Sequence, residues 1–189
     1  GCGAIFNGPR SPTVYVAAND GMLHAFNATN GVERWAYIPG LMMPRLYRLA
    51  DRNYKDNHEY FVDGSPTVGD VYDTAAAKWK TVLVGGLRSG GRGYYALDVT
   101  DPSNPIAMWE FNVRALASCP SATVAGDTDD CDLGLTFGNP AITKLADGTW
   151  VVVVTSGYNN VGPGDGKGYV YVLKAVTGQI IRKIQAANA

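Results

Sequence analysis

The sequence has no hydrophobic run of about 18 consecutive apolar residues, the minimum for a membrane-spanning helix. It also has no excess of one charge, since 16 Lys and Arg face 17 Asp and Glu and leave a formal net charge of −1. A chain with balanced charge has no general attraction for nucleic acid or for an acidic membrane surface. We therefore expect neither nucleic acid nor a direct membrane span among its interactions.

Residues that commonly carry out catalysis are scarce. The only two histidines are His24 and His58, and neither the Gly-x-Ser-x-Gly motif nor the His-Glu-x-x-His motif occurs. The glycine-rich segment 85–93 lacks the Gly-Lys-Ser/Thr of a phosphate-binding loop and is typical of a hairpin loop. The sequence therefore predicts a protein that is not an enzyme.

Cysteine is also rare, with three residues in the chain. Cys119 and Cys131 lie close together in a polar, Asp-rich segment, whereas Cys2 lies far from both. Their spacing does not match a zinc site, and no histidine lies nearby. Two alternatives remain, a pair of free thiols or a disulfide that closes the polar segment. We favour the Cys119–Cys131 disulfide, which an oxidising compartment would maintain.

Glycine, by contrast, is abundant at 23 residues, and aromatic residues reach 11%. Between turn residues, short segments alternate apolar and polar side chains with a period of two, the pattern of half-buried strands. Eleven segments have this pattern: 13–17, 22–27, 33–38, 66–72, 80–85, 93–99, 106–111, 140–145, 150–155, 169–174 and 179–184. The sequence thus predicts an all-β chain of short antiparallel strands.

The predicted strands repeat as a set with a period of about 70 residues. Apolar runs at 82–84 and 151–154 occupy the same place in the set as 14–17, and Trp109 follows Trp35 at a similar interval. A repeated unit of four antiparallel strands is typical of a β-propeller blade. About three blades are expected, the first without its first strand, in a larger propeller completed by further blades or by a partner chain. Within one partial propeller domain, 1–189, the predicted boundaries are blade one 11–40, an interblade helical insert 41–58, blade two 59–112, a Cys/Asp-rich loop 113–132 and blade three 133–186.

Several single residues carry structural predictions. The insert has Pro44 where a helix can begin, with Leu46 and Leu49 on one face and arginines on a solvated face. Asp98 is expected to anchor a turn. The tryptophans are expected to pack between blades and to donate their indole N–H groups to the backbone. These tryptophans are Trp35, Trp79, Trp109 and Trp150.

The best metal candidate is the acidic run at 127–132. Calcium takes several oxygen ligands, and the closely spaced carboxylates of Asp127, Asp129 and Asp132 are expected to converge on one ion. The run does not match the EF-hand pattern, because Asp132 stands where that pattern has glycine. The alternative is a solvated acidic loop. Calcium is thus a possible ligand and not a required cofactor.

Ordered motifs in the chain resemble a known family. Segment 19–35 (NDGMLHAFNATNGVERW) resembles a quinoprotein-type blade motif and, more specifically, the C-terminal propeller of the PilY1/PilC family of type IV pilus biogenesis proteins. Further matching motifs follow in the family's order over nearly the whole chain: HEYFVDGSP at 58–66, GGRGYYALDVTDP at 90–102, MWEF at 108–111, DLGLTFGNP at 132–140 and SGYNN at 156–160.

The resemblance implies a scaffold or adhesin module of a pilus tip-associated protein, which supports pilus assembly and surface attachment. Its partners would be pilus proteins such as minor pilins, or host or surface receptors. Its location would be the cell surface, the pilus or the outer membrane, after export through the periplasm. Two alternatives share the fold: part of a pyrroloquinoline-quinone-dependent dehydrogenase propeller, or a periplasmic scaffold propeller.

Overall fold

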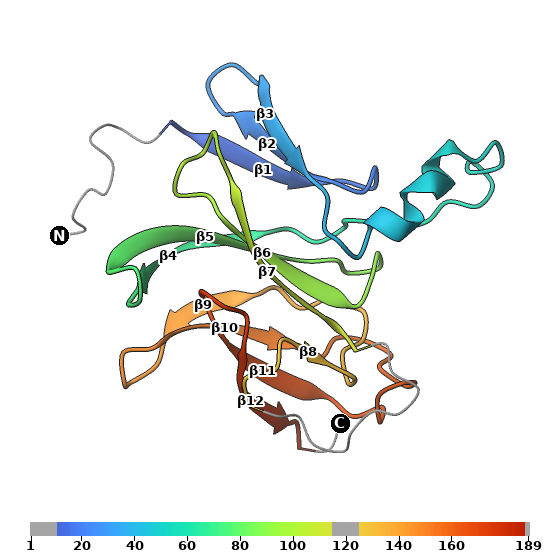
Figure 1. Cartoon of the computed structure of the whole chain (residues 1–189). Coiled ribbons are helices and arrows are strands. Elements are labelled where there is room, and N and C mark those ends of the chain that lie inside the picture. The colour runs from blue at the N-terminus through green and yellow to red at the C-terminus, as the bar shows by residue number, and fades with distance from the viewer. Residues whose placement is uncertain (1–10, 115–124, 188–189) are drawn as a thin grey trace.

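The computed structural model describes residues 11–114 and 125–187, which form three β-sheets that lie one above another (Figure 1). Each sheet corresponds to one predicted blade, with neighbours in chain order that are antiparallel except for the pair β7 and β8. Blade one contains β1 (Thr13–Ala17), β2 (Leu23–Asn27) and β3 (Glu33–Tyr37). Blade two contains β4 (Thr67–Asp73), β5 (Lys78–Gly86), β6 (Gly93–Asp98), β7 (Ile106–Val113) and β8 (Asp129–Asp130). Blade three contains β9 (Ala141–Lys144), β10 (Trp150–Thr155), β11 (Tyr169–Lys174) and β12 (Ile180–Gln185).

All eleven predicted strands are present, but the interpretation of 113–132 as a loop was incomplete. Strand β7 extends through Val113, and the two-residue strand β8 adds to the edge of blade two in parallel with β7. The backbone N–H of Arg114 donates to the carbonyl oxygen of Asp130 at 3.2 Å. A strand of two acidic residues has no alternating pattern, so its pairing could not be recognised from the sequence.

Each blade has a register irregularity in the corresponding strand pair: β2 and β3 in blade one, β6 and β7 in blade two, and β11 and β12 in blade three. It lies at Ala25/Phe26 in blade one, at Ala96/Leu97 in blade two and at Val172/Leu173 in blade three. An extra residue at such a bulge increases the local twist of the sheet. The recurrence of this bulge confirms that the three sheets are copies of one structural unit.

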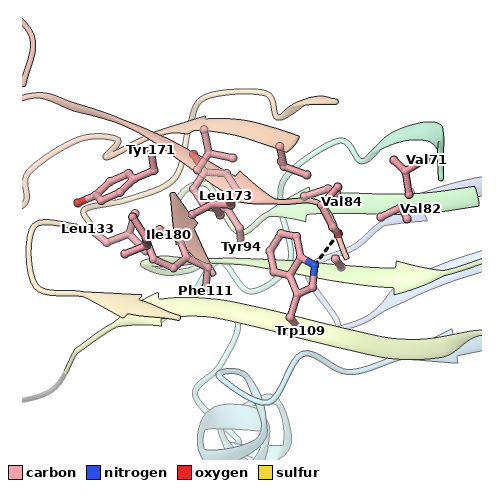
Figure 2. Packing of buried hydrophobic residues seen from close by; sticks show 14 residues of the cluster. Val71, Val82, Val84, Tyr94, Trp109, Phe111, Leu133, Tyr171, Leu173 and Ile180 are labelled. Atoms are coloured by element: carbon pink, nitrogen blue, oxygen red, sulfur yellow. Dashed lines mark hydrogen bonds between the residues drawn. The ribbon is translucent and has the colours of Figure 1, made fainter. Parts of the chain in front are cut away.

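The hydrophobic core is divided into two clusters, each shared by neighbouring blades. One cluster joins blades two and three and includes Trp109, Phe111, Tyr171 and Leu173 (Figure 2). The other joins blades one and two through side chains such as Tyr95. Each blade therefore buries its faces against its neighbours, as expected for a repeat architecture.

Two tryptophans connect successive blades in the same way. The Trp35 indole nitrogen donates to the carbonyl oxygen of Pro102 in blade two at 2.9 Å. The Trp109 indole nitrogen donates to the carbonyl oxygen of Ala175 in blade three, also at 2.9 Å (Figure 2). The prediction of packing tryptophans with backbone acceptors is thus confirmed for this pair.

The other two tryptophans behave differently. Trp79 and Trp150 meet edge to face, with ring centroids 5.7 Å apart, and both are only partly covered. They bring blades two and three together near the surface rather than in the core.

The prediction that Asp98 anchors a turn is confirmed, because Asp98 accepts a hydrogen bond from the backbone N–H of Thr100 at 3.0 Å.

The insert between blades one and two contains a helix, η1 (Met43–Ala50), which is a 3₁₀ helix and begins with Pro44 in its first turn. Two of its arginines do not simply face solvent, because Arg45 and Arg48 both pair with the carboxylate of Glu59. The described residues contain no helix with the length and apolar character needed to cross a membrane.

Candidate functional site around the acidic segment

The predicted aspartates are divided between two cationic side chains. Asp127 and Asp129 both face Arg114, which directly follows β7. The Nη2 atom of Arg114 lies 2.6 Å from Asp127 Oδ2 and 2.5 Å from Asp129 Oδ1. Hydrogen bonds to Asp129 and then Asp127 raise the pKa of the Arg114 guanidinium above its ordinary value. The single guanidinium therefore pairs with two of the three predicted ligands.

The third aspartate pairs with a lysine from blade three. Lys183 on β12 places its Nζ atom 2.5 Å from Asp132 Oδ2 and 2.8 Å from Asp130 Oδ1. Asp130 and Asp132 are only 5% and 8% exposed. A charge at such a site needs both an opposite charge and hydrogen bonds to offset its lost hydration. The Lys183 ammonium lies between both carboxylates and supplies one positive charge, and hydrogen bonds to the two carboxylates add to this compensation.

Two tyrosines complete the surroundings of the ammonium group. Lys183 Nζ lies 4.3 Å from the ring centroid of Tyr169 and 5.7 Å from that of Tyr171. The Tyr171 hydroxyl donates to Asp130 Oδ1 at 2.8 Å. Burial, followed by the charge of Asp130, raises the pKa of Tyr171 far above its ordinary value, so this phenol stays a proton donor.

Asp132 also holds the long loop between β10 and β11. Its Oδ1 atom accepts the backbone N–H of Asp165 at 2.7 Å. The Asn160 side chain donates to the carbonyl oxygens of Asp132 at 2.8 Å and of Lys167 at 2.7 Å. The acidic segment, this loop and β12 are therefore joined in one polar network, which we call the Lys183 network.

This geometry does not fit the predicted convergence of Asp127, Asp129 and Asp132 on a calcium ion. Arg114 and Lys183 occupy the positions between the carboxylates. Over the described part of the chain, no group of three or more His, Cys, Asp or Glu side chains is arranged to hold a metal ion. Calcium binding therefore stays a prediction, and an ion would have to displace the Arg114 guanidinium.

The structure describes only one of the two cysteines of the predicted disulfide. Cys131 lies between Asp130 and Asp132, is 3% exposed and is disulfide-bonded. Cys119 lies outside the described residues, so the Cys119–Cys131 pairing itself stays a prediction.

Sequence reasoning missed the cations of this site. Arg114 and Lys183 carry no motif, and Lys183 lies in a strand far along the chain from the acidic segment. Asp130 belonged to the acidic run but was not among the predicted ligands. The sequence feature that pointed to a cation here was Lys183 within a predicted strand. A lysine at such a position is equally well explained by a solvent-exposed side chain.

A second ionic cluster lies on blade one. His24 Nδ1 is 2.6 Å from Glu33 Oε1, and His24 Nε2 is 2.8 Å from Asp20 Oδ2. Hydrogen bonding to Glu33 is the main cause that raises the pKa of the imidazole, with a further contribution from Asp20. The other histidine, His58, contacts the rings of Tyr54 and Tyr60.

The His24 cluster predicts a pH-dependent stability. Because its folded-state pKa is raised, protonated His24 contributes stability below its unfolded pKa of about 6.5 and loses it as pH rises through the folded value. Partly exposed pairs contribute up to about 1 kcal/mol, which corresponds to about 2–4 °C for a chain of this size. We expect His24→Gln to lower the melting temperature by this amount at pH 5.5 and by less at pH 8.5. An equal loss at both pH values would contradict the assignment.

Comparison with known proteins identifies the family. The model of the PilY1 beta-propeller domain matches residues 4–188. The chain is 40% identical over 180 residues to the type IV pilus biogenesis factor PilY1 of Pseudomonas aeruginosa PAO1. The matched region covers 95% of this chain and 14% of that protein. It is also 46% identical over 151 residues to a PilY1 homolog of Xylella fastidiosa. That matched region covers 80% of this chain and 11% of the homolog.

A solved structure agrees with these sequence matches. The crystal structure of the P. aeruginosa PilY1 C-terminal domain superposes with a TM-score of 0.71 at 36% identity, over 95% of this chain and 31% of that one. The chain thus spans about one third of that domain and a small part of each full-length relative. The chain belongs to the PilY1 family of type IV pilus biogenesis factors and forms part of its β-propeller domain.

Proposed function

We propose that this chain is a non-enzymatic scaffold and adhesin module of a pilus tip-associated protein and acts by binding pilus proteins such as minor pilins. The observation that carries the proposal is the similarity to type IV pilus biogenesis factors over 95% of the chain. The architecture supports a scaffold, because two shared cores and repeated tryptophan bonds hold the blades together. Host or surface receptors are further partners of this module.

Exposed apolar side chains on the interblade insert and just after it support contact with a protein partner. Met43 and Tyr47 of the insert are 64% and 71% exposed, and Tyr60, which follows it, is 49% exposed. Large exposed apolar side chains occur at many interaction surfaces, and tyrosines often dominate the binding energy there. We propose that this surface of the insert binds a minor pilin.

Surface plasmon resonance with purified minor pilins tests the function. We expect at least one pilin to bind the chain, and Tyr47→Ser to weaken that binding about tenfold. Tyr158→Ser is the matched control, because Tyr158 is similarly exposed at 68% but lies in the loop before β11. The proposal fails if no pilin binds, and the contact surface is elsewhere if the two variants behave alike.

Export and surface location follow from the same proposal. The disulfide of Cys131 supports an oxidising compartment, because such bonds are rare in the cytosol. Immunogold labelling of cells that express the full-length parent protein is expected to mark pili or the cell surface. A dye-linked redox assay with added quinone tests the dehydrogenase alternative, and any turnover would contradict the non-enzymatic proposal.

The calcium prediction has its own test. If calcium binds the acidic segment, it will raise the melting temperature, and Asp127→Ala/Asp129→Ala will abolish the rise. Ligand at 100 times its dissociation constant stabilises a protein by about 2.7 kcal/mol, or about 5–10 °C for this chain. Differential scanning calorimetry with calcium or magnesium measures the shift. No shift in the unsubstituted chain would contradict the calcium prediction and leave the pairing with Arg114 as the role of Asp127 and Asp129.

A further inference from the structure

A cavity of about 410 Å³ lies between blades two and three, away from the Lys183 network. Three chain turns form it: the end of β4 with the residues that follow, the β9–β10 turn and the β11–β12 turn. In Figure 1 the β4–β5 and β9–β10 turns lie on the left side, opposite η1. Among the described residues, those that line the cavity all come from these two blades.

Aromatic side chains provide one wall. Tyr72 and Trp150 line the cavity, and Trp79 bridges them with ring centroids 5.6 Å from Tyr72 and 5.7 Å from Trp150. The ring contacts are edge to face, so the row is held in a fixed arrangement across the two blades. A wall of this kind favours a ligand with an apolar face.

Polar groups also line the cavity. Asp147, Thr149 and Thr177 contribute one carboxylate and two hydroxyls to the lining. Their turns are fixed by local hydrogen bonds. The backbone N–H of Thr149 donates to Asp147 Oδ1 at 2.8 Å, and that of Ala75 donates to Asp73 Oδ1 at 3.1 Å. The donors and acceptors are therefore in place before a ligand arrives.

The charges around the cavity favour a neutral ligand. Asp73 is paired with Lys80 at 3.1 Å, and the lining contains both the Asp147 carboxylate and the Lys174 ammonium. Lys144 already places its ammonium group 5.8 Å from the ring centroid of Trp150. A cationic ligand would meet these lysines and an anionic ligand would meet Asp147, so neither sign is favoured.

We propose that this cavity binds a neutral carbohydrate, with the apolar face of a pyranose ring against Trp150 and its hydroxyls on Asp147 and the threonines. Sugars combine C–H faces with many hydroxyl groups, which matches a lining of aromatic rings, a carboxylate and hydroxyls. The volume lies within the range of small-molecule sites and accommodates one or two sugar rings. The site is separate from the pilin-binding surface and does not depend on it.

Titration calorimetry of the 189-residue chain tests the proposal with glucose, galactose, mannose and N-acetylglucosamine as neutral probes. Glucosamine and glucuronic acid are the charged counterparts. We expect at least one neutral sugar to bind with a dissociation constant of about 1 mM and the charged sugars to bind more weakly. Binding of none of the four, or tighter binding of a charged sugar, overturns the proposal.

Substitutions locate the binding. Asp147→Asn removes a charge but keeps a turn-forming side chain, and we expect it to weaken binding about tenfold. Asp101→Asn is the matched control, because Asp101 also accepts a backbone N–H in its turn, from Ser103 at 2.9 Å, but lies outside the cavity. Trp150→Ala should abolish binding, with melting curves to verify that the variant is folded. Equal effects of the two Asp→Asn variants would overturn the assignment of the site.

Discussion

Replacing Trp109 with alanine is expected to lower the free energy of unfolding by about 4 kcal/mol, the largest effect of any single side chain considered. Trp109 is 8% exposed and lies in the core between blades two and three (Figure 2). Truncation removes most of this buried surface and leaves a cavity that the two rigid sheets fill only in part. Chemical denaturation followed by circular dichroism measures the loss.

Trp109→Phe separates packing from hydrogen bonding. Phenylalanine keeps an aromatic ring but cannot donate to the Ala175 carbonyl, which the indole N–H reaches at 2.9 Å. Leaving a buried acceptor without a partner costs about 1–3 kcal/mol. The Phe variant is therefore expected to lie between the unsubstituted chain and Trp109→Ala in stability.

The position of Gly178 supports the importance of this contact. A Cβ atom there would lie 2.7 Å from the Trp109 ring, and the backbone φ is +70°. Both features require glycine, so the turn of blade three is shaped around the indole of blade two.

Trp79→Ala is the matched control for Trp109→Ala. Trp79 is the same residue type and is 36% exposed. Its removal is expected to cost about 1 kcal/mol, since less apolar surface returns to water. If both variants lose the same stability, the core between blades two and three is not held by Trp109 as argued.

The strands and the blade repeat could be predicted because they depend on local patterns. Alternation with a period of two marks each strand, and the repeated positions of Trp35 and Trp109 mark the same site in successive blades. The sequence predicted that each indole N–H would donate to a backbone carbonyl group. Which residue provides that carbonyl depends on how two sheets pack, and no local pattern shows this packing.

The Lys183 network could not be predicted for the same reason. The acidic run was visible, and closely spaced carboxylates predict a cation, but sequence spacing does not distinguish a metal ion from a lysine ammonium or an arginine guanidinium. The structure supplies both of the latter, from β12 and from the end of β7. The calcium prediction stays untested, and the two cationic side chains reach the carboxylates only through the tertiary structure.

Lys183→Met is expected to lower the free energy of unfolding by about 3 kcal/mol. Methionine retains an unbranched apolar chain, so the change removes mainly the ammonium group, which lies 2.8 Å from Asp130 and 2.5 Å from Asp132. Removing one partner of a buried ion pair leaves an uncompensated charge and costs about 3–5 kcal/mol. Urea denaturation followed by tyrosine and tryptophan fluorescence measures the change.

Lys174→Met provides the matched control, because Lys174 is an exposed lysine of the same blade whose ammonium bonds to the Gln179 amide at 3.1 Å. It should change stability by less than about 0.5 kcal/mol. The decisive variant is Lys183→Met/Asp130→Asn/Asp132→Asn, which removes the buried charges together with their counter-ion. If uncompensated charge is the cause, this triple variant will recover much of the stability that Lys183→Met loses. If it is less stable than the single variant, packing of the lysine stem against Tyr169 and Tyr171 matters more than charge, and the ionic account of the network is wrong.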